Sequence, residues 1–430
     1  MVPQTRRRFL RRAAAAGVLT SLSGCTGRPL PGPFGDDPVP GRATNEAYGA
    51  SYAPGGEWPV VGHDGGRTSH GRSAVPTGDV DVAWRRRPGD DPHRTHGPVV
   101  GPDRVYTLYS ERRDDDRDPV VWLVGLDAET GDRQVQTRLW PGYPAGVALA
   151  GDRLVTLTRG PEYDTATLTA VGRREGRREW RATIPDVTGP PAVVDDTCYL
   201  ATRGDDHAVY AYALDGTRLW RAPVDGECYT AVCADERGLY VGLVDGRVAA
   251  FERESGATRW VNQTVSFAPG RPAIQGMPTV ADGRLYVPGM QGGLVSADGT
   301  DGTVLWRTTV VEDDYGNRVP SPAVAGETVY VSTPHGGVLA VDATDGSTRR
   351  ELSAEGDDRP LAVSDDTVVV PRHGSVSAVD ASGDTEWTVD LTVPDVGNVG
   401  YIMDTEVALA HGMCYVAVAD GRVYALGARD

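Results

Sequence analysis

A glycine followed four residues later by a tryptophan recurs along the chain, and this repeat constrains the fold more than any other feature. The tryptophans of the first four copies stand 40, 40 and 46 residues apart. Such a period is typical of the four-stranded blades of a β-propeller, whose units must stack on one another to bury their sheet faces. The copies are Gly176/Trp180, Gly216/Trp220, Gly256/Trp260, Gly302/Trp306 and Gly383/Trp387, with a degenerate copy at Gly346/Arg350.

The rest of each unit reads as short strands joined by tight turns. Segments such as Leu285-Tyr286 end one alternating strand, and a Val-x-Ala pattern marks the next. Turn tips such as Asp245-Gly246 suit two-residue hairpins. The tryptophan falls on the strand that follows, where we expect its indole to pack between blades. This blade-docking role is predicted for Trp84, Trp180, Trp220, Trp260, Trp306 and Trp387.

The number of units predicts an all-β, eight-bladed propeller of four-stranded antiparallel blades. The chain ends after three strands of an eighth copy, and Asp81-Val82-Ala83-Trp84 has the sequence of the missing outer strand. We therefore expect this N-terminal strand to close the ring. Seven blades is the alternative, if the weak unit at 144–184 is not a blade. The seven full copies close near Val135, Trp180, Trp220, Trp260, Trp306, Arg350 and Trp387.

This array resembles the pyrroloquinoline-quinone (PQQ) repeat propellers. That family includes the quinoprotein alcohol dehydrogenases and a bacterial lipoprotein of the outer-membrane β-barrel assembly machinery. The resemblance covers roughly residues 57–430, and the stretch from Trp58-Pro59 to Arg67-Thr68 is similar to the leading segment of the non-enzymatic members. It implies the propeller fold, but a fold does not by itself imply an activity.

The N-terminus is typical of an export signal. Residues 1–24 contain Arg6 and Arg7 in a twin-arginine pattern, followed by an apolar run too short to span a bilayer. Leu22-Ser23-Gly24-Cys25 matches a lipobox, which predicts lipidation at Cys25. The Pro- and Gly-rich residues 25–56 then act as a disordered tether. We expect a protein anchored by lipid on the extracellular face of the cytoplasmic membrane; a cleaved signal with a chance cysteine is the alternative.

The charge balance limits which kinds of organism and which classes of binding partner fit this protein. The chain has no lysine, 43 arginines and 60 acidic residues, giving a net charge of −17. Such a surface repels nucleic acid and anionic lipid. Excess aspartate without lysine resembles proteins of haloarchaea, where high salt screens the carboxylates; an acidic protein from a GC-rich bacterium is the alternative.

Cysteine and histidine positions do not predict a metal site. Cys198 and Cys414 share one repeat position and fit buried apolar sites, and Cys228 and Cys233 are expected on opposite faces of one strand. The histidines lie at hairpin tips or in connecting segments, without carboxylates at ligand spacing. The Asp-rich segments 298–301, 342–345 and 380–384 resemble calcium loops only loosely and fit ordinary turns.

A comparison with the quinoprotein pattern argues against catalysis. Those enzymes share an adjacent Cys-Cys pair facing the cofactor and a Glu/Asn/Asp set that binds calcium, and this sequence has no Cys-Cys pair. We therefore expect no PQQ, no calcium and no catalytic residue. The leading hypothesis is a monomeric protein-binding or assembly scaffold for an unknown envelope or extracellular protein. A PQQ-dependent oxidoreductase is the alternative, and a sensor or solute-binding module is a third.

The predicted binding site is the funnel mouth, where the innermost strand of each blade begins. Several of these starts read x-Pro before an apolar strand, as at Tyr143-Pro144 and Arg359-Pro360. Tyrosine and arginine there would suit an interface; plain solvated connections are the alternative. The candidate residues are Tyr229, Gln275, Tyr315, Asn317, Arg318, Arg359, Asn398, Tyr401 and Asp404.

Overall fold

The computed structural model describes most of the propeller region, and all of the described residues belong to the compact unit Val39–Asp430. The described ranges are 56–89, 92–111, 118–266, 273–274, 276–289, 292–310, 319–333, 337–354, 359–364, 367–372, 374–380, 382–391, 407–418 and 421–429. The export signal, Cys25 and nearly all of the predicted tether lie outside them. Within these ranges, no helix is long and apolar enough to cross a membrane.

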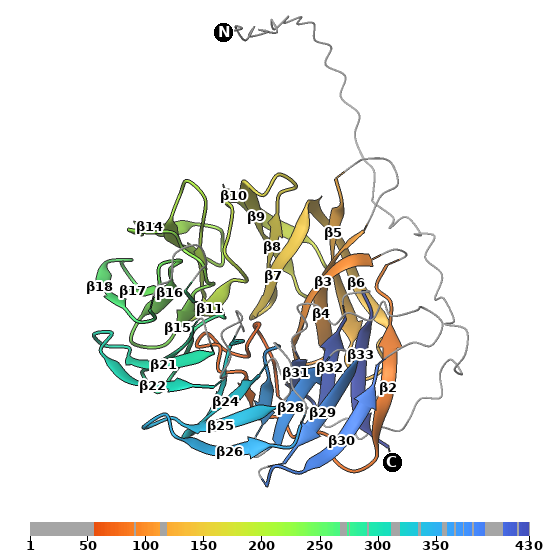
Figure 1. Cartoon of the computed structure of the whole chain (residues 1–430). Coiled ribbons are helices and arrows are strands. Elements are labelled where there is room, and N and C mark those ends of the chain that lie inside the picture. The colour runs from red at the N-terminus through yellow and green to blue at the C-terminus, as the bar shows by residue number, and fades with distance from the viewer. Residues whose placement is uncertain are drawn as a thin grey trace, which may run out of the picture. The chain divides into compact units, whose positions relative to one another are not determined.

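Eight separate sheets are arranged around a common axis (Figure 1). Blade one contains β3 (Pro92–Val100), β4 (Arg104–Glu111), β5 (Val120–Asp127) and β6 (Arg133–Pro141). Blade two contains β7 (Tyr143–Ala150), β8 (Arg153–Arg159), β9 (Thr165–Gly172) and β10 (Arg178–Pro185). Blade three contains β11 (Ala192–Val194), β12 (Thr197–Ala201), β13 (Ala208–Ala213) and β14 (Arg218–Pro223). Blade four contains β15 (Cys233–Ala234), β16 (Leu239–Gly242), β17 (Arg247–Phe251) and β18 (Thr258–Gln263).

The remaining blades follow in the same order. Blade five contains β19 (Thr279–Ala281), β20 (Arg284–Pro288), β21 (Gly293–Asp298) and β22 (Val304–Thr309). Blade six contains β23 (Ala323–Ala325), β24 (Thr328–Ser332), β25 (Val338–Asp342) and β26 (Thr348–Leu352). Blade seven contains β27 (Ala362–Ser364), β28 (Thr367–Arg372), β29 (Ser375–Val379) and β30 (Thr385–Asp390), with β1 (His70–Gly71) added in parallel to β27. Blade eight contains β31 (Val407–Ala410), β32 (Met413–Ala417) and β33 (Val423–Ala428), completed by β2 (Val80–Arg86).

Ring closure by the N-terminal strand is confirmed. Strand β2 pairs antiparallel with β33, so that Asp81 lies opposite Gly427 and Trp84 opposite Ala425. The first and last parts of the propeller are therefore hydrogen-bonded within one sheet. This pairing covers an edge of β33 that would otherwise expose unpaired backbone groups. The predicted eight blades, and not seven, are confirmed by the sheets.

A β-bulge recurs at one position of all eight outer strands. In each blade the ladder skips the residue just before the tryptophan position, as at Leu219 before Trp220. The skipped residue changes the twist of the strand and re-aims the side chain that follows. Val135 and Arg350 stand directly after the same irregularity. They are therefore the degenerate tryptophan positions that the repeat predicted.

Each tryptophan of the repeat contacts the blade that follows. In five of the six, the indole Nε1 donates to a carbonyl oxygen in the turn after the third strand of that blade. The pairs are Trp84 with Ala128 (3.0 Å), Trp180 with Leu214 (2.7 Å), Trp220 with Arg253 (3.0 Å), Trp260 with Gly299 (3.2 Å) and Trp306 with Ala343 (3.0 Å). Burial of the ring and this directional bond together fix the angle between blades.

The repeat glycine lies against the preceding blade's tryptophan. A Cβ added at Gly256 would lie 2.6 Å from the Trp220 ring, and Gly256 has a φ of 69°. Both conditions favour glycine. The glycine of such a pair therefore contacts the tryptophan of the preceding repeat unit, across the interface between blades, and not the tryptophan four residues after it.

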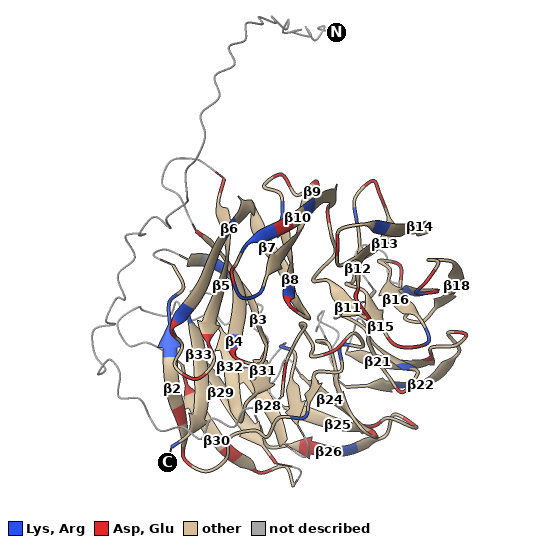
Figure 2. Cartoon of the chain, turned by 180° about the vertical axis from the view of Figure 1, so that it is seen from behind, with Lys and Arg blue, Asp and Glu red and all other residues tan. Residues whose placement is uncertain are grey.

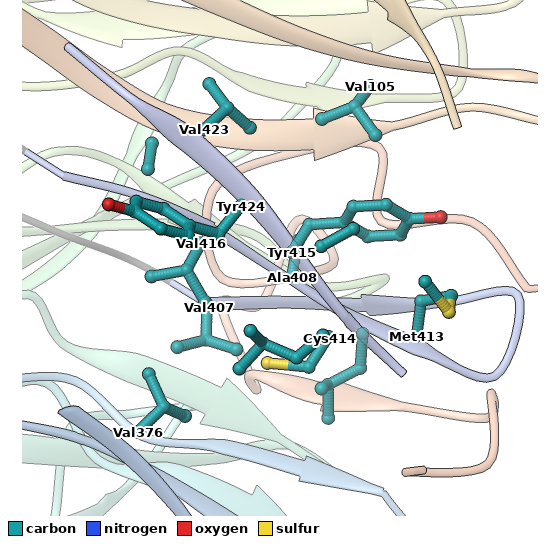
Figure 3. Packing of buried hydrophobic residues seen from close by; sticks show 14 of the residues in the cluster. Val105, Val376, Val407, Ala408, Met413, Cys414, Tyr415, Val416, Val423 and Tyr424 are labelled. Atoms are coloured by element: carbon teal, nitrogen blue, oxygen red, sulfur yellow. The ribbon is translucent and has the colours of Figure 1, made fainter. Parts of the chain in front are cut away.

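Blade eight packs between blades seven and one. Figure 3 shows Val376 of blade seven and Val105 of blade one on either side of the blade-eight cluster that includes Tyr415 and Val416. Val105, Val376, Tyr415 and Val416 are all fully buried. Inter-blade stacking of this kind supplies most of the apolar burial in a propeller.

The cysteine prediction needs one correction. Cys228 and Cys233 do not share a strand, because β15 begins at Cys233 and Cys228 forms only an isolated bridge with Leu243. The predicted strand is broken because residues 229–232, between the two cysteines, are not in strand conformation. All four described cysteines are free and buried, and burial raises the pKa of Cys228 and of Cys233 to about 12. They are therefore unreactive thiols at neutral pH.

Candidate functional site

The hub segment, residues 57–76, runs along the inner strands of the ring. It contacts every blade through hydrogen bonds, most of them between backbone groups. Blades one and two use Trp58 N to Val100 O (2.8 Å) and Leu149 N to Pro59 O (2.6 Å). Blades four to seven use Ala234 N to Gly65 O, Val280 N to Gly66 O, Val324 N to Thr68 O and Val363 N to Ser69 O, each 2.7–2.8 Å. Blade eight uses Gly412 N to Ser73 Oγ (3.0 Å), and blade three is contacted by Arg67.

Arg67 is the buried charge of the hub segment, with 2% of its surface exposed. Its Nε donates to Val232 O (2.9 Å), its Nη1 to Val61 O (3.1 Å) and its Nη2 to Pro190 O (2.9 Å). The planar guanidinium thus joins blades three and four to the hub segment itself. Sequence reasoning noted Arg67 only as part of a family resemblance. A lone arginine among small residues gave no further signal.

Asp64 stabilises the sharp bend of the hub segment. Its two carboxylate oxygens accept from Thr68 N (3.0 Å) and Thr68 Oγ1 (2.6 Å). Desolvation would raise the pKa of Asp64, but the nearby His63 ring and the hydrogen bonds from Thr68 outweigh it and lower that pKa. The nearby backbone has positive φ at His63, Arg67 and Ser69. Such conformations are uncommon for these residues and are held here by the surrounding contacts.

Some of the hub contacts fall at the carboxyl ends of the inner strands. Val100 and Ala234 are the last residues of β3 and β15. Through Arg67 the segment also reaches Pro190 and Val232, which precede β11 and β15 at their amino ends. The hub segment therefore lies along the axis between the two ends of the inner strands. In Figure 1 the hub segment is the orange-red trace near the axis.

Only two of the predicted mouth residues lie in the described part of the chain. Tyr229 is 37% exposed, and its backbone N donates to Gly242 O (2.9 Å). Arg359 is half-buried, and its carbonyl accepts from Ser332 Oγ (2.6 Å). These two residues belong to blades four and seven and are not brought into contact. Gln275, Tyr315, Asn317, Arg318, Asn398, Tyr401 and Asp404 lie outside the described residues.

The structure brings together a different group at the mouth of blades one and two. The rings of Tyr143 and Tyr163 stack with centroids 5.2 Å apart and planes at 18°. The Arg94 guanidinium carbon lies 4.5 Å from the centroid of Tyr143, and its Nη1 donates to the hydroxyl of Tyr163 (3.3 Å). Sequence reasoning missed this group, since Tyr143 was noted only as the residue before a proline.

A buried ion pair network supports the same mouth. Asp186 is 3% exposed and accepts from Arg159 Nε (2.6 Å) and Arg203 Nε (2.5 Å). Burial lowers the pKa of Arg159, although Asp186 opposes that shift. The Arg159 guanidinium carbon also lies 5.8 Å from the Tyr163 ring. Asp186 therefore holds both arginines and fixes the position of Arg159 beside Tyr163.

The donors required for metal-dependent chemistry do not gather in the described ranges, where no three His, Cys, Asp or Glu side chains could hold a metal ion. The Asp-rich turns have local partners instead. Asp298 Oδ1 accepts from Thr300 N (2.7 Å), and Asp342 Oδ1 from Thr344 N (2.7 Å). These oxygens stabilise their own turns, as expected for aspartate before a hairpin glycine.

The fold and the repeat geometry define a PQQ-repeat β-propeller. Residues 118–234 and 244–371 match the family model described as "Outer membrane protein assembly factor BamB", and the chain belongs to this family. A search of curated proteins by sequence finds no match.

Solved structures agree on the fold. BamB from Moraxella catarrhalis is 18% identical, with a TM-score of 0.57, covering 81% of this chain and 98% of that one. A europium-containing methanol dehydrogenase is 14% identical, with a TM-score of 0.64, covering 88% and 99%. The quinohemoprotein alcohol dehydrogenase from Comamonas testosteroni is 15% identical, with a TM-score of 0.65, covering 88% and 81%. At these identities the likeness concerns the fold alone.

Proposed function

We propose that this protein is a non-catalytic scaffold that binds another protein on the mouth face of its propeller. The observation that carries the proposal is the hub segment, which ties the inner strands of all eight blades together. A framework bound in this way positions its loops with little conformational freedom, which lowers the entropic cost of binding. In the described ranges no three His, Cys, Asp or Glu side chains could hold a metal ion.

The proposed location is the extracellular face of the cytoplasmic membrane. Arg6 and Arg7 direct export, Cys25 carries the lipid, and residues 25–56 form the tether. The lysine-free, acidic composition supports a haloarchaeal setting and argues against nucleic acid as partner. On this proposal the protein is a monomer, and its partner is an envelope or extracellular protein.

The mouth residues named from the sequence remain part of the proposal. Tyr229 supports it by its exposed ring, and Arg359 would place a positive charge on the same face. Tyr315, Asn317, Arg318, Tyr401 and Asp404 complete the proposed surface. Arg359→Ala and Tyr401→Ala are expected to weaken partner capture without lowering the melting temperature.

The second candidate is a PQQ-dependent oxidoreductase, favoured only by the likeness to methanol and alcohol dehydrogenases. It requires PQQ and calcium, and we propose that neither is bound. The missing Cys-Cys pair and the turn-bound aspartates support this.

The deciding experiment is affinity purification of the tethered protein from its own membrane in high salt, followed by identification of the co-purifying proteins. The scaffold proposal expects a stoichiometric partner that is lost in the Arg359→Ala, Tyr401→Ala double variant. Isolation without any partner, together with alcohol-dependent dye reduction after addition of PQQ and calcium, would instead establish the enzyme.

A further inference from the structure

Blades one and two differ from the rest of the propeller in charge. Residues 92–186 contain 14 arginines and 15 acidic residues, whereas residues 187–430 contain 17 arginines and 36 acidic residues. The excess negative charge thus lies almost entirely outside these two blades. Figure 2 shows blue segments on β10 in this sector. An acidic polypeptide approaching the propeller would meet the least repulsion here.

Exposed arginines of blade two lie on a tryptophan of blade one. The guanidinium carbons of Arg181 and Arg178 lie 4.1 and 5.1 Å from the centroid of Trp140. Trp140 Nε1 donates to Thr169 Oγ1 of blade two (2.9 Å), which fixes the ring across the seam between blades. The stacked arginines are held in place and still face solvent.

The mouth end of the same seam carries the Arg94, Tyr143 and Tyr163 group. In the described part of the chain, four of the five arginines that lie over an aromatic ring belong to this seam. No described carboxylate lies within ion-pair distance of Arg94, Arg178 or Arg181. Tyr163 is 40% exposed with a φ of 57°, an uncommon conformation for tyrosine. Strain of this kind is characteristic of binding sites.

Two buried hydroxyl groups without partners accompany this group. Ser110 Oγ and Thr158 Oγ1 lie in side chains that are 0% and 1% exposed, and neither has a hydrogen-bond partner. Ser110 stands opposite Arg94 in its ladder, and Thr158 is the neighbour of Arg159, which stands opposite Tyr143. Opposed residues of an antiparallel ladder project to the same side, so the Ser110 hydroxyl shares a side of the sheet with Arg94. Unsatisfied buried hydroxyls are rare in folded proteins and call for an explanation.

We propose that this seam surface, formed by Arg94, Trp140, Tyr143, Tyr163, Arg178 and Arg181, docks an acidic segment of a partner polypeptide. The arginines bind carboxylates through paired N–H groups. The rings contribute apolar contact area at low entropic cost, since they are already stacked. This inference rests on the proposed scaffold function, and it names the chemistry of the partner and a second surface that extends from the mouth to the outer strands.

The test uses the mature protein and a fluorescent peptide rich in Asp, with a matched peptide in which Asn replaces Asp. Anisotropy is recorded at the lowest salt concentration at which near-UV circular dichroism shows the fold intact. We expect the Asp peptide to bind and the Asn peptide to fail. Arg94→Ala, Arg178→Ala and Arg181→Ala should each weaken binding by about three- to tenfold, and added salt should weaken it further.

Arg218→Ala is the matched control. Arg218 is exposed and stands two residues after Gly216, just as Arg178 stands two residues after Gly176, but it lies in blade three. Its removal changes the net charge equally and should leave peptide binding unchanged. Arg181→Lys keeps the charge and loses the planar stacking, so we expect an intermediate affinity.

Three results would overturn the proposal: no binding of the Asp peptide, an equal loss with Arg218→Ala, or equally tight binding of a single-stranded nucleic acid of the same charge. The last result would define a general polyanion surface. These results do not decide the purification experiment, which tests the scaffold proposal separately. If the partner is retained by the Arg94→Ala, Arg181→Ala double variant but lost on mutation of Arg359 and Tyr401, this inference is rejected and the scaffold proposal stands.

Discussion

The indole Nε1 of Trp387 donates a 2.6 Å hydrogen bond to the carbonyl oxygen of Pro76, which precedes it by 311 residues. The other five repeat tryptophans donate to the turn after the third strand of the following blade. Blade eight lacks that turn, because its outer strand β2 is supplied by the N-terminus. The N-terminal segment therefore supplies both the outer strand of blade eight and the carbonyl oxygen that accepts the hydrogen bond from the tryptophan of blade seven. Closure depends on one continuous stretch from Pro76 to Arg86.

Trp84→Ala should lower the free energy of unfolding by roughly 3–5 kcal/mol, the range for a large buried aromatic residue. Trp84 is 6% exposed and bonds to blade one. Urea denaturation in constant salt measures the change. Trp180 is less buried, so Trp180→Ala should cost less. A protein truncated to begin near residue 95 that melts like the full chain would contradict this closure.

Gly256→Ala should destabilise more than Gly326→Ala. Both glycines have positive φ, 69° and 55°, so both substitutions carry the backbone cost of about 1 kcal/mol. The Gly326 Cβ would meet open space, whereas the Gly256 Cβ would meet the Trp220 ring at 2.6 Å. The extra loss at Gly256, measured by thermal melting, reports the inter-blade contact alone. Equal melting temperatures would show that the glycine serves only the turn.

Arg67→Met should cost roughly 3 kcal/mol or more, because three carbonyl oxygens, two of them in buried hydrogen bonds, lose their donor. Arg72→Met, at an exposed arginine of the same hub segment, should have little effect on denaturant midpoint. Hydrogen exchange should also rise in the inner strands of blades three and four in the Arg67 variant. Unchanged exchange there would mean that the hub segment is not held by Arg67.

Asp64 should make a pH-dependent contribution to stability. Its folded-state pKa is lowered, so the contribution is present above the unfolded value of about 3.9 and is lost as pH falls through the folded value. The stability difference between the wild type and Asp64→Asn should therefore shrink as pH decreases from about 5 toward 2. A difference that is constant or grows on acidification would contradict the assignment.

Mutations in the export signal and at the lipidated cysteine should give different phenotypes. Arg6→Lys with Arg7→Lys should leave the precursor inside the cell, whereas Cys25→Ser should release mature protein into the medium. Cell fractionation with immunoblotting distinguishes the two. Cys25→Ser protein that stays membrane-bound would show that the lipid is not the main attachment.

The repeat predicted the blade count and the ring closure because these follow from local patterns. Val135 and Arg350 were recognisable as tryptophan positions from spacing alone, and the sheets place both after the shared bulge. The site was less accessible to sequence reasoning. Arg94, Tyr143 and Tyr163 come from three different segments, and nothing in the order of these residues indicates that they stack.

The sequence by itself determined the all-β architecture, the eight blades and the strand that closes them, since each blade is specified by a pattern within about 40 residues. Only the tertiary structure decided what the regular spacing of glycine and tryptophan does between blades, where Gly256 contacts Trp220. It also decided the path of the hub segment, in which Arg67 bonds to carbonyls up to 165 residues away. Contacts over such distances depend on how the ring closes in space, and no local pattern encodes them.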